Sequence, residues 1–410
     1  MKKSIGAKPL KPSFNFKAVG KKSTGLSSSA RAMDPVFLIL VFILLAFGLV
    51  MLFSASFARA YYYKQGNSFH FIFKQSIHAA LGLLAMFVVS KIDYTKLKKF
   101  AMPLFLISLC LLVVVLFMKG DANGIKRWIK IGSFFQFQPS ELMKFSLILL
   151  FSSMISANQS KMKTFRFGVL LFSTLLGIVV CLMYLEPHLS GIILMCSIAG
   201  VMMFVGGTRP RWFIILFLIA GAALVYILFF RGNYMGGRVY YWLHPFSDPI
   251  KNTMQTDQSL LAIGSGGVFG LGLGKSRQKF MYLPEVHNDF IFAVICEELG
   301  IVGAVVVIVL FVLFCYKGFE IASKSKDKFG TLLCAGIVAQ FGIQAMFNIA
   351  VVTATVPNTG ISLPFFSYGG TALAMQLAEM GVVLSVSRHA LTPKLSGVSR
   401  PLGKLRRIRG

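Results

Sequence analysis

The sequence is poor in acidic residues and in charge of either sign. It has 14 Asp and Glu against 42 Lys and Arg among 410 residues, and charged residues make up only 14% of the chain. Soluble globular chains usually carry about 25% charged residues. Because 56% of the residues are hydrophobic, a soluble fold could not keep so much apolar surface from water. The composition excludes soluble, disordered and disulfide-scaffold classes and favours a membrane protein.

Paired cysteines and a phosphate-binding loop are also missing. The six cysteines all lie in apolar runs without CxxC spacing, which favours packed thiols over disulfides or zinc. Gly274-Lys275-Ser276 is similar to the end of a P-loop, but Phe269 stands where that motif needs its first glycine. We expect this glycine-rich stretch to form tight turns and close backbone packing. Alternatively, Lys275, Arg277 and Lys279 face an anionic lipid or its pyrophosphate.

Long apolar runs dominate what is present. Ten of them are long enough, or nearly so, to cross a hydrocarbon core of about 30 Å as helices, and we expect an all-α polytopic membrane protein. The runs are 35–58, 75–90, 101–118, 140–157, 168–186, 189–206, 212–230, 289–316, 330–355 and 367–387. They predict a membrane domain over 34–388 with one long outer loop at about 231–288. Basic tails over 1–33 and 389–410 flank this domain.

The basic residues lie at the ends of the apolar runs. With the N-terminus in the cytoplasm, the inner segments hold 28 Lys and Arg and the outer segments hold 13. This excess follows the positive-inside rule, so we place both termini in the cytoplasm. It also accounts for the net charge of +28 without a nucleic-acid partner. The tails are better explained as topology and anionic-lipid signals.

A carboxylate at the outer mouth of the eighth run is the first candidate for chemistry. Asp289 opens that run, and Glu285 lies four residues before it. Ionisable residues at a membrane span are functional candidates by default. A helix cap stabilised by the helix dipole is the alternative for Asp289.

Further polar groups interrupt other runs. Glu141 and Lys144 stand three residues apart in the fourth run, which predicts a structural ion pair or, if it faces a cavity, a binding site. Glu186-Pro187-His188 interrupts a long apolar stretch. It is either a tight outer turn between two spans or part of a cavity lining. Glu379 and a stripe of Gln340, Gln344 and Asn348 fit hydrogen bonding between helices.

Four stretches of the chain carry a family resemblance. The sequence resembles the SEDS family, named for shape, elongation, division and sporulation, which includes FtsW, RodA and SpoVE. The stretches follow the family's order and span about 240 residues of the chain: 126–129 with 138–144, 258–267, 283–292 and 364–370. Residues 272–279 are more similar to the division-type pattern than to the elongation-type one.

The resemblance implies a peptidoglycan glycosyltransferase that polymerises lipid II at the outer face of the bacterial cytoplasmic membrane, during septal synthesis. It also implies a class B penicillin-binding transpeptidase and other division proteins as partners. The family's essential aspartate corresponds to Asp289. The chain departs from the family at His188, where members commonly have aspartate, so His188 cannot act there as a carboxylate.

The chemistry of lipid II is consistent with these residues. The acceptor sugar hydroxyl must lose a proton as it attacks the donor's anomeric carbon, and one carboxylate acting as base contributes about 10²–10⁴-fold. We assign this role to Asp289. The leaving pyrophosphate develops negative charge and needs fixed cations. The candidate substrate-binding residues are Arg127, Lys130, Glu141, Lys144, Lys275, Arg277, Lys279, Glu285 and His287.

The sequence leaves cofactors and two other functions open. A divalent cation such as Mg²⁺ or Mn²⁺ could assist the pyrophosphate, but no set of metal ligands stands out. A transporter that flips lipid II would depend more on Glu141, Lys144, Glu186 and Glu379 than on Asp289. A non-catalytic division scaffold would depend on the basic tails.

Overall fold

The computed structural model describes residues 32–118, 127–131, 135–215, 240–248 and 253–390. These residues form helices and a single pair of short strands. In chain order the elements are α1 (Pro35–Tyr63), α2 (His70–Lys91), η1 (Tyr94–Phe100), α3 (Ala101–Phe117), β1 (Ile129–Ile131), β2 (Phe135–Phe137), α4 (Pro139–Ala157), η2 (Gln159–Lys163), η3 (Arg166–Leu171), α5 (Phe172–Leu185), α6 (Leu189–Val205), α9 (Met254–Gly266), α10 (Ile291–Ser323), α11 (Lys328–Val352) and α12 (Gly370–Arg388).

The helices follow the predicted apolar runs. Within the described residues, eight helices are long and apolar enough to cross a membrane, and α6 is a shorter apolar helix. The predicted run 212–230 lies almost entirely outside the described residues. Helix α10 continues to Ser323, seven residues past the predicted end at 316. It extends beyond its apolar part because Lys317 pairs with Glu320 at 2.9 Å, one turn away.

Aspartates begin two helices at the end of the molecule that we assign to the cytoplasm. Asp34 precedes α1 and accepts hydrogen bonds from the amides of Val36 at 3.1 Å and Phe37 at 3.0 Å. Asp327 precedes α11 and accepts from the amide of Gly330 at 3.0 Å. These side chains satisfy amides that have no partner within the helix. Both helices therefore have a defined starting residue.

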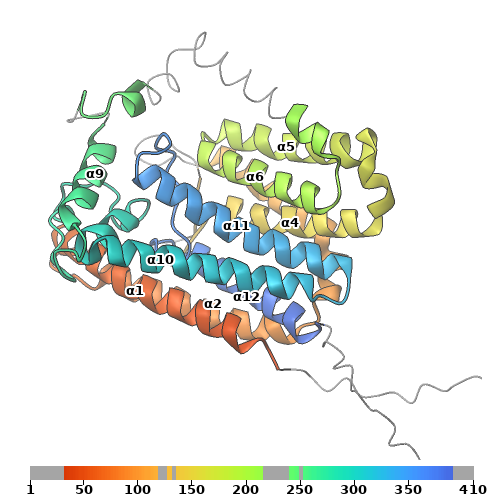
Figure 1. The fold of residues 1–410 in the computed structure, drawn as a ribbon, viewed down its shortest axis with the longest axis horizontal. Helices are drawn as coiled ribbons and strands as arrows, with labels where there is room; N and C mark the ends of the chain where they lie inside the picture. The colour runs from red at the N-terminus through yellow and green to blue at the C-terminus, as the bar shows by residue number, and fades with distance from the viewer. Residues whose placement is uncertain (1–31, 119–126, 132–134, 216–239, 249–252, 391–410) are drawn as a thin grey trace, which may run out of the picture. The chain divides into compact units, whose positions relative to one another are not determined.

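The helices pack side by side, with α10 between α1 and α11 (Figure 1). Helix α12 packs along α2, and two glycines allow this close approach. A Cβ on Gly82 would lie 3.0 Å from the Cα of Ala374, and one on Gly381 would meet the backbone of Met86. The two axes therefore approach more closely than larger side chains would permit.

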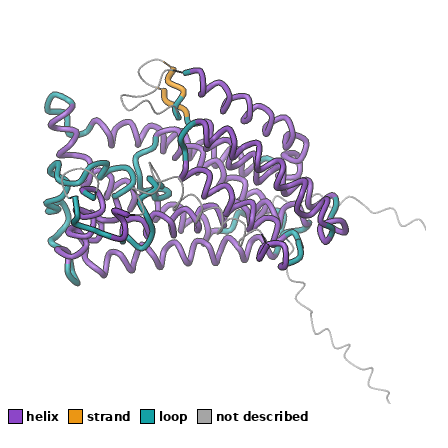
Figure 2. Tube along the Cα trace, turned by 90° about the horizontal axis from the view of Figure 1, so that it is seen from above, coloured by secondary structure: helices purple, strands orange, loops and turns teal. Residues whose placement is uncertain are grey.

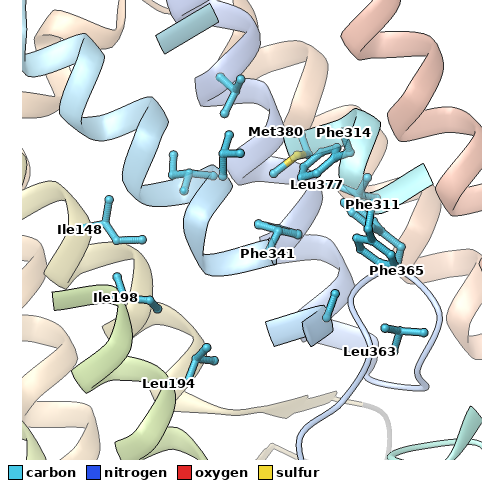
Figure 3. Packing of buried hydrophobic residues seen from close by; sticks show 14 of the residues in the cluster. Ile148, Leu194, Ile198, Phe311, Phe314, Phe341, Leu363, Phe365, Leu377 and Met380 are labelled. Atoms are coloured by element: carbon cyan, nitrogen blue, oxygen red, sulfur yellow. The ribbon is translucent and has the colours of Figure 1, made fainter. Parts of the chain in front are cut away.

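An aromatic cluster anchors the loop that leads into α12. Figure 3 shows Phe365 pointing toward Phe341 and Phe314 in the core. The ring centroids of Phe341 and Phe365 are 5.2 Å apart, and those of Phe314 and Phe365 are 6.0 Å apart. All three side chains are buried. Such packing fixes the loop backbone, and with it the start of α12.

A break in α10 binds a glycine-rich segment. Gly300 has φ 67° and ψ −163°, which interrupts the helix. The carbonyls of Glu297 and Glu298 accept from the amides of Leu271 and Gly272, each at 2.9 Å. On the other side of the break, the amide of Ile301 donates to the carbonyl of Gly267 at 3.0 Å. The segment after α9 thus takes over hydrogen bonds that the break removes from α10. This finding fits the predicted close backbone packing.

The two strands form a short antiparallel hairpin, drawn in orange in Figure 2. Ile129 pairs with Phe137, and Lys130 pairs with Gln136. The hydroxyl of Thr371, in the first turn of α12, donates to the carbonyl of Gln136 at 2.7 Å. This bond joins the hairpin to α12 and places the residues just before β1 beside the start of that helix.

Candidate active site

A cavity of about 420 Å³ lies where several helices begin. Its wall includes the first residues of α4, α6 and α12, the residues before α10, and the loop that precedes α12. The charged residues in its lining are Lys74, Arg127, Glu141, Lys144 and Asp289. Four of these five were predicted from the sequence as site residues, and the fold brings them to one place.

Asp289 lies two residues before α10 and is half-buried. Its backbone is held in place by Asn348 of α11, whose Nδ2 donates to the carbonyls of Asp289 at 2.7 Å and Ile361 at 2.6 Å. The neighbouring Gly360 has φ +71°, and a Cβ there would lie 3.2 Å from Oδ2 of Asp289. The glycine therefore leaves room for the carboxylate.

The surroundings of Asp289 favour its protonated form. Burial and the negative charge of Glu285 raise its pKa from 3.8 to about 6, while Arg127 opposes this shift. A carboxylate with a pKa near the working pH is a more effective general base than one with an ordinary pKa. At neutral pH Asp289 is ionised, and its raised pKa makes it a stronger base than an ordinary aspartate, so it can accept a proton.

Glu141 and Lys144 form an ion pair that faces the cavity. The Nζ of Lys144 lies 2.9 Å from the carboxylate of Glu141 and 3.2 Å from Oε1 of Gln344. Lys144 is only 3% exposed. The predicted ion pair is therefore present, and it lines the cavity.

Arg127 enters the cavity from the residues just before β1. Its guanidinium donates to the carbonyl of Pro187, which joins the hairpin to the turn between α5 and α6. The backbone of Lys130 lies in β1, but its side chain is outside the described residues. The same turn brings His188 to the cavity. Burial, aided by Arg127 and Lys144, lowers the pKa of His188 to about 3, so its imidazole is neutral.

Glu285 and His287 lie beside the cavity and hold the segment that carries Asp289. Glu285 is 3.2 Å from the guanidinium of Arg59 and accepts from Nδ2 of Asn288 at 2.6 Å. The ring of His287 packs against Phe71, with centroids 4.6 Å apart, and its carbonyl accepts from the amide of Tyr368 at 2.9 Å. Neither residue belongs to the cavity lining.

The cations of the glycine-rich loop do not line the cavity. Lys275 and Arg277 are exposed. Lys279 is fully buried, with its Nζ 2.8 Å from the carboxylate of Glu298. Amides of the same loop also donate to Glu298 and its neighbour Glu297. The amide of Gly274 lies 2.9 Å from the carboxylate of Glu298, and the amide of Arg277 lies 2.8 Å from that of Glu297. The Gly-Lys-Ser stretch thus surrounds carboxylates of α10 as a P-loop would surround a phosphate.

Several residues that line the cavity were not predicted as site residues from the sequence. Lys74 and His78 come from α2, and Gly360, Gly369 and Gly370 come from the loop and helix at the C-terminal end of the domain. Sequence alone offered a signal for the last two, because they belong to or adjoin the family-like stretch at 364–370. Nothing in the spacing of Lys74 or His78 marks them as part of this site.

A metal site is not preformed here. The described residues contain no group of three or more His, Cys, Asp and Glu side chains arranged to hold a metal ion. The carboxylates in the cavity lining are Asp289 and Glu141, and Glu141 is already paired with Lys144. These two carboxylates do not constitute a ligand set for a divalent cation.

Comparisons with known proteins identify the family. The family model described as "cell cycle protein", which covers FtsW, RodA and SpoVE, matches residues 35–392, and the chain belongs to this family. A protein of Geobacter sp. strain M18 named probable peptidoglycan glycosyltransferase FtsW is 39% identical over 356 residues, 86% of this chain and 96% of that protein. Stage V sporulation protein E of Bacillus subtilis is 38% identical over 370 residues, 89% of this chain and all of that protein.

Solved structures agree with this assignment. A chain from a peptidoglycan synthase complex that coordinates polymerization and crosslinking has a TM-score of 0.73 and 30% identity, covering 87% of this chain and 98% of that one. Thermus thermophilus RodA, a rod shape determining protein, has a TM-score of 0.65 and 29% identity, covering 88% and 99%. The predicted all-α polytopic membrane fold is thereby confirmed.

Proposed function

We propose that this chain polymerises lipid II into glycan strands at the outer face of the cytoplasmic membrane, with Asp289 as the general base. The observation that carries the proposal is the carboxylate of Asp289, whose pKa is raised, in a cavity where the other carboxylate, Glu141, is paired with Lys144. The curated relatives named peptidoglycan glycosyltransferase support the same reaction class. The chain is accordingly a glycosyltransferase and not only a binding protein.

The reaction is a direct displacement at the donor's anomeric carbon. Asp289 accepts the proton of the acceptor's sugar hydroxyl as that oxygen forms the new glycosidic bond. The bond between the anomeric carbon and the pyrophosphate oxygen breaks, and its electron pair leaves with the lipid pyrophosphate. One base with no second carboxylate as nucleophile inverts the anomeric centre. Glu141 is held by Lys144 at 2.9 Å, so it is not the nucleophile of a covalent route.

Two of the cations that line the cavity are our candidates for binding the leaving group. Arg127 comes from the hairpin and Lys144 from the first turns of α4. Fixed positive charges stabilise the charge that develops on a leaving pyrophosphate, and they act more strongly in a cavity than in water. We assign Arg127 and Lys144 to this stabilisation. Lys275, Arg277 and Lys279 are not part of this assignment because they lie away from the cavity.

A transpeptidase partner follows from the relatives by analogy. The structural neighbour belongs to a complex whose description joins polymerization to crosslinking. We propose that this chain works beside a class B penicillin-binding transpeptidase, and at the division septum. The names of the relatives support a septal role, since several are FtsW proteins.

The test uses the purified chain with its cognate transpeptidase, labelled lipid II and a β-lactam that blocks crosslinking. We expect long glycan strands from the wild type and none from Asp289→Asn. Glu320→Gln is the matched control, because it removes a carboxylate near the opposite end of α10, where Glu320 pairs with Lys317. This control should polymerise like the wild type.

Three outcomes separate the explanations. Strands from both the wild type and Asp289→Asn would remove Asp289 from the chemistry. Strands from neither, with both proteins folded and paired with the partner, would contradict the polymerase assignment and leave a lipid-flipping activity to be assayed. Loss in the Glu320→Gln control as well would show that any change of charge inactivates the protein, which would overturn the specific role of Asp289.

A further inference from the structure

Three helices begin at the cavity without a side-chain cap. Helix α4 follows Gln138, α6 follows His188 and α12 follows Gly369, and none of these residues accepts a hydrogen bond from its own helix through its side chain. Residues of all three first turns line the cavity. The start of a helix carries about half a positive charge, from amides without an intrahelical partner. The cavity therefore receives three positive helix ends in addition to its cations.

The start of α12 combines two glycines that line the cavity with two open amides. Gly369 and Gly370 both line the cavity and have no Cβ to cover the backbone. Within the described part of the chain, the amides of Gly370 and Thr371 donate to no acceptor. The hydroxyl of Thr371 is directed elsewhere, to the carbonyl of Gln136. Two adjacent amides are thus available to a ligand in the cavity.

Two buried polar side chains in the same lining also lack a partner. Ser140, in the first turn of α4, is 3% exposed, and His188 is 8% exposed. The Oγ of Ser140 and the Nδ1 of His188 have no hydrogen-bond partner among the described residues. Buried polar atoms are nearly always satisfied in folded proteins. Two unsatisfied atoms at neighbouring helix starts indicate a ligand that brings its own polar groups.

The charges of the lining define the class of ligand. The lining holds three cations, Lys74, Arg127 and Lys144, against the carboxylates of Glu141 and Asp289. The three helix ends add further positive potential. Helix starts with open amides are anion-binding sites, and phosphate groups are their usual ligands. The pyrophosphate of a lipid-linked sugar carries two negative charges and several acceptor oxygens. It therefore matches both the charge and the open donors of this wall.

We propose that the pyrophosphate of the donor binds at the uncapped start of α12, accepting from the amides of Gly370 and Thr371 and from the hydroxyl of Ser140. Arg127 and Lys144 balance its remaining charge. The inference rests on the proposed polymerase function and deepens it by assigning the wall that holds the leaving group. It also explains why α12 begins with glycine: a Ser, Asp or Asn cap would stabilise the helix but would occupy the donors.

The main test gives α12 the cap that it lacks. In Gly369→Asp, the new carboxylate can accept from the first-turn amides and repels a phosphate. The position tolerates a side chain, because its φ of −171° is extended and a Cβ there would meet only the Cβ of Ala372, at 3.4 Å. We expect the KM for lipid II and the inhibition constant for inorganic pyrophosphate each to rise at least tenfold. The melting temperature should stay equal or increase.

The matched control adds the same charge at another uncapped helix start. Phe69 precedes α2, is 63% exposed and does not line the cavity. Phe69→Asp should polymerise lipid II with the wild-type KM and show the wild-type sensitivity to pyrophosphate. An equal loss in Phe69→Asp would mean that outer negative charge alone repels the substrate, and this would overturn the assignment to α12.

A second variant keeps the test decisive if Gly369→Asp does not fold. Ser140→Ala removes a buried hydroxyl that has no protein partner, so a purely structural role predicts unchanged or higher stability with unchanged kinetics. The proposal predicts the same stability with a KM raised about fivefold or more. If the wild type makes strands and both variants keep its KM and its sensitivity to pyrophosphate, the proposal is overturned. A wild type that makes no strands would instead contradict the function on which the proposal rests.

Discussion

Lowering the pH should inactivate the enzyme by protonating Asp289. The pKa of this carboxyl is about 6, raised first by burial and then by the charge of Glu285. Because a general base must be ionised, activity is retained above this pKa and lost as the pH falls through it. About 90% of the side chain is ionised at pH 7, half at pH 6 and about 10% at pH 5. Activity should therefore fall about tenfold between pH 7 and pH 5.

An aspartate of ordinary pKa would behave differently. With a pKa of 3.8, more than about 90% would still be ionised at pH 5, and activity would scarcely change over the same interval. The assay should report kcat/KM for lipid II, since this ratio follows the pKa values of the free enzyme. The melting temperature at each pH shows whether the protein remains folded.

The substitution Glu285→Gln identifies the cause of the shift. Glu285 raises the pKa of Asp289 and does not line the cavity. Removing its charge should move the acidic limb to lower pH, without abolishing the maximum rate. Flat wild-type activity from pH 7 to pH 5, or an acidic limb unmoved in Glu285→Gln, would refute the reasoning.

Three further predictions concern stability and positioning. Asp289→Asn should be more stable than the wild type at pH 7, by at most about 3 kcal/mol, because a pKa raised by about two units penalises the ionised form; chemical denaturation in detergent would measure it, and a loss of stability would contradict it. Lys279→Met should destabilise the fold by about 3–5 kcal/mol, since it leaves Glu298 buried without its cation; a normal melting temperature with a raised KM for lipid II would instead make Lys279 a substrate ligand. Gly360→Ala should lower kcat at least tenfold by displacing the carboxylate of Asp289 and straining a φ of +71°, and unchanged kinetics would show that the carboxylate does not need this space.

The membrane architecture was predictable because it depends on runs of apolar residues. Nine of the ten predicted runs coincide with helices of the described chain, and the tenth, 212–230, falls almost wholly outside it. Periodicity and hydropathy predicted the ends of the helices less accurately. Helix α10 runs past its apolar part because Lys317 and Glu320 stabilise its last turns, and hydropathy does not register ion pairs.

The composition of the site was predictable only in part. Asp289, Arg127, Glu141 and Lys144 carry charge in an apolar sequence, so they attract attention. The glycine-rich loop was harder, because a cation after a glycine run fits a phosphate and a carboxylate equally well. Only the fold shows that this loop surrounds the carboxylates of Glu297 and Glu298 of α10, and that Lys279 is the counter-ion of Glu298.

The polarity of the site follows from the direction of its helices. With the N-terminus in the cytoplasm, α4, α6 and α12 all begin at the outer end, where the first turns of all three line the cavity. The positive-inside rule meanwhile keeps most Lys and Arg on the opposite side. An outer site for an anionic lipid must therefore draw part of its positive potential from backbone amides. Such a site leaves little trace in residue charge, and its open helix start at Gly369 cannot be recognised until the first turns of three helices are seen to meet.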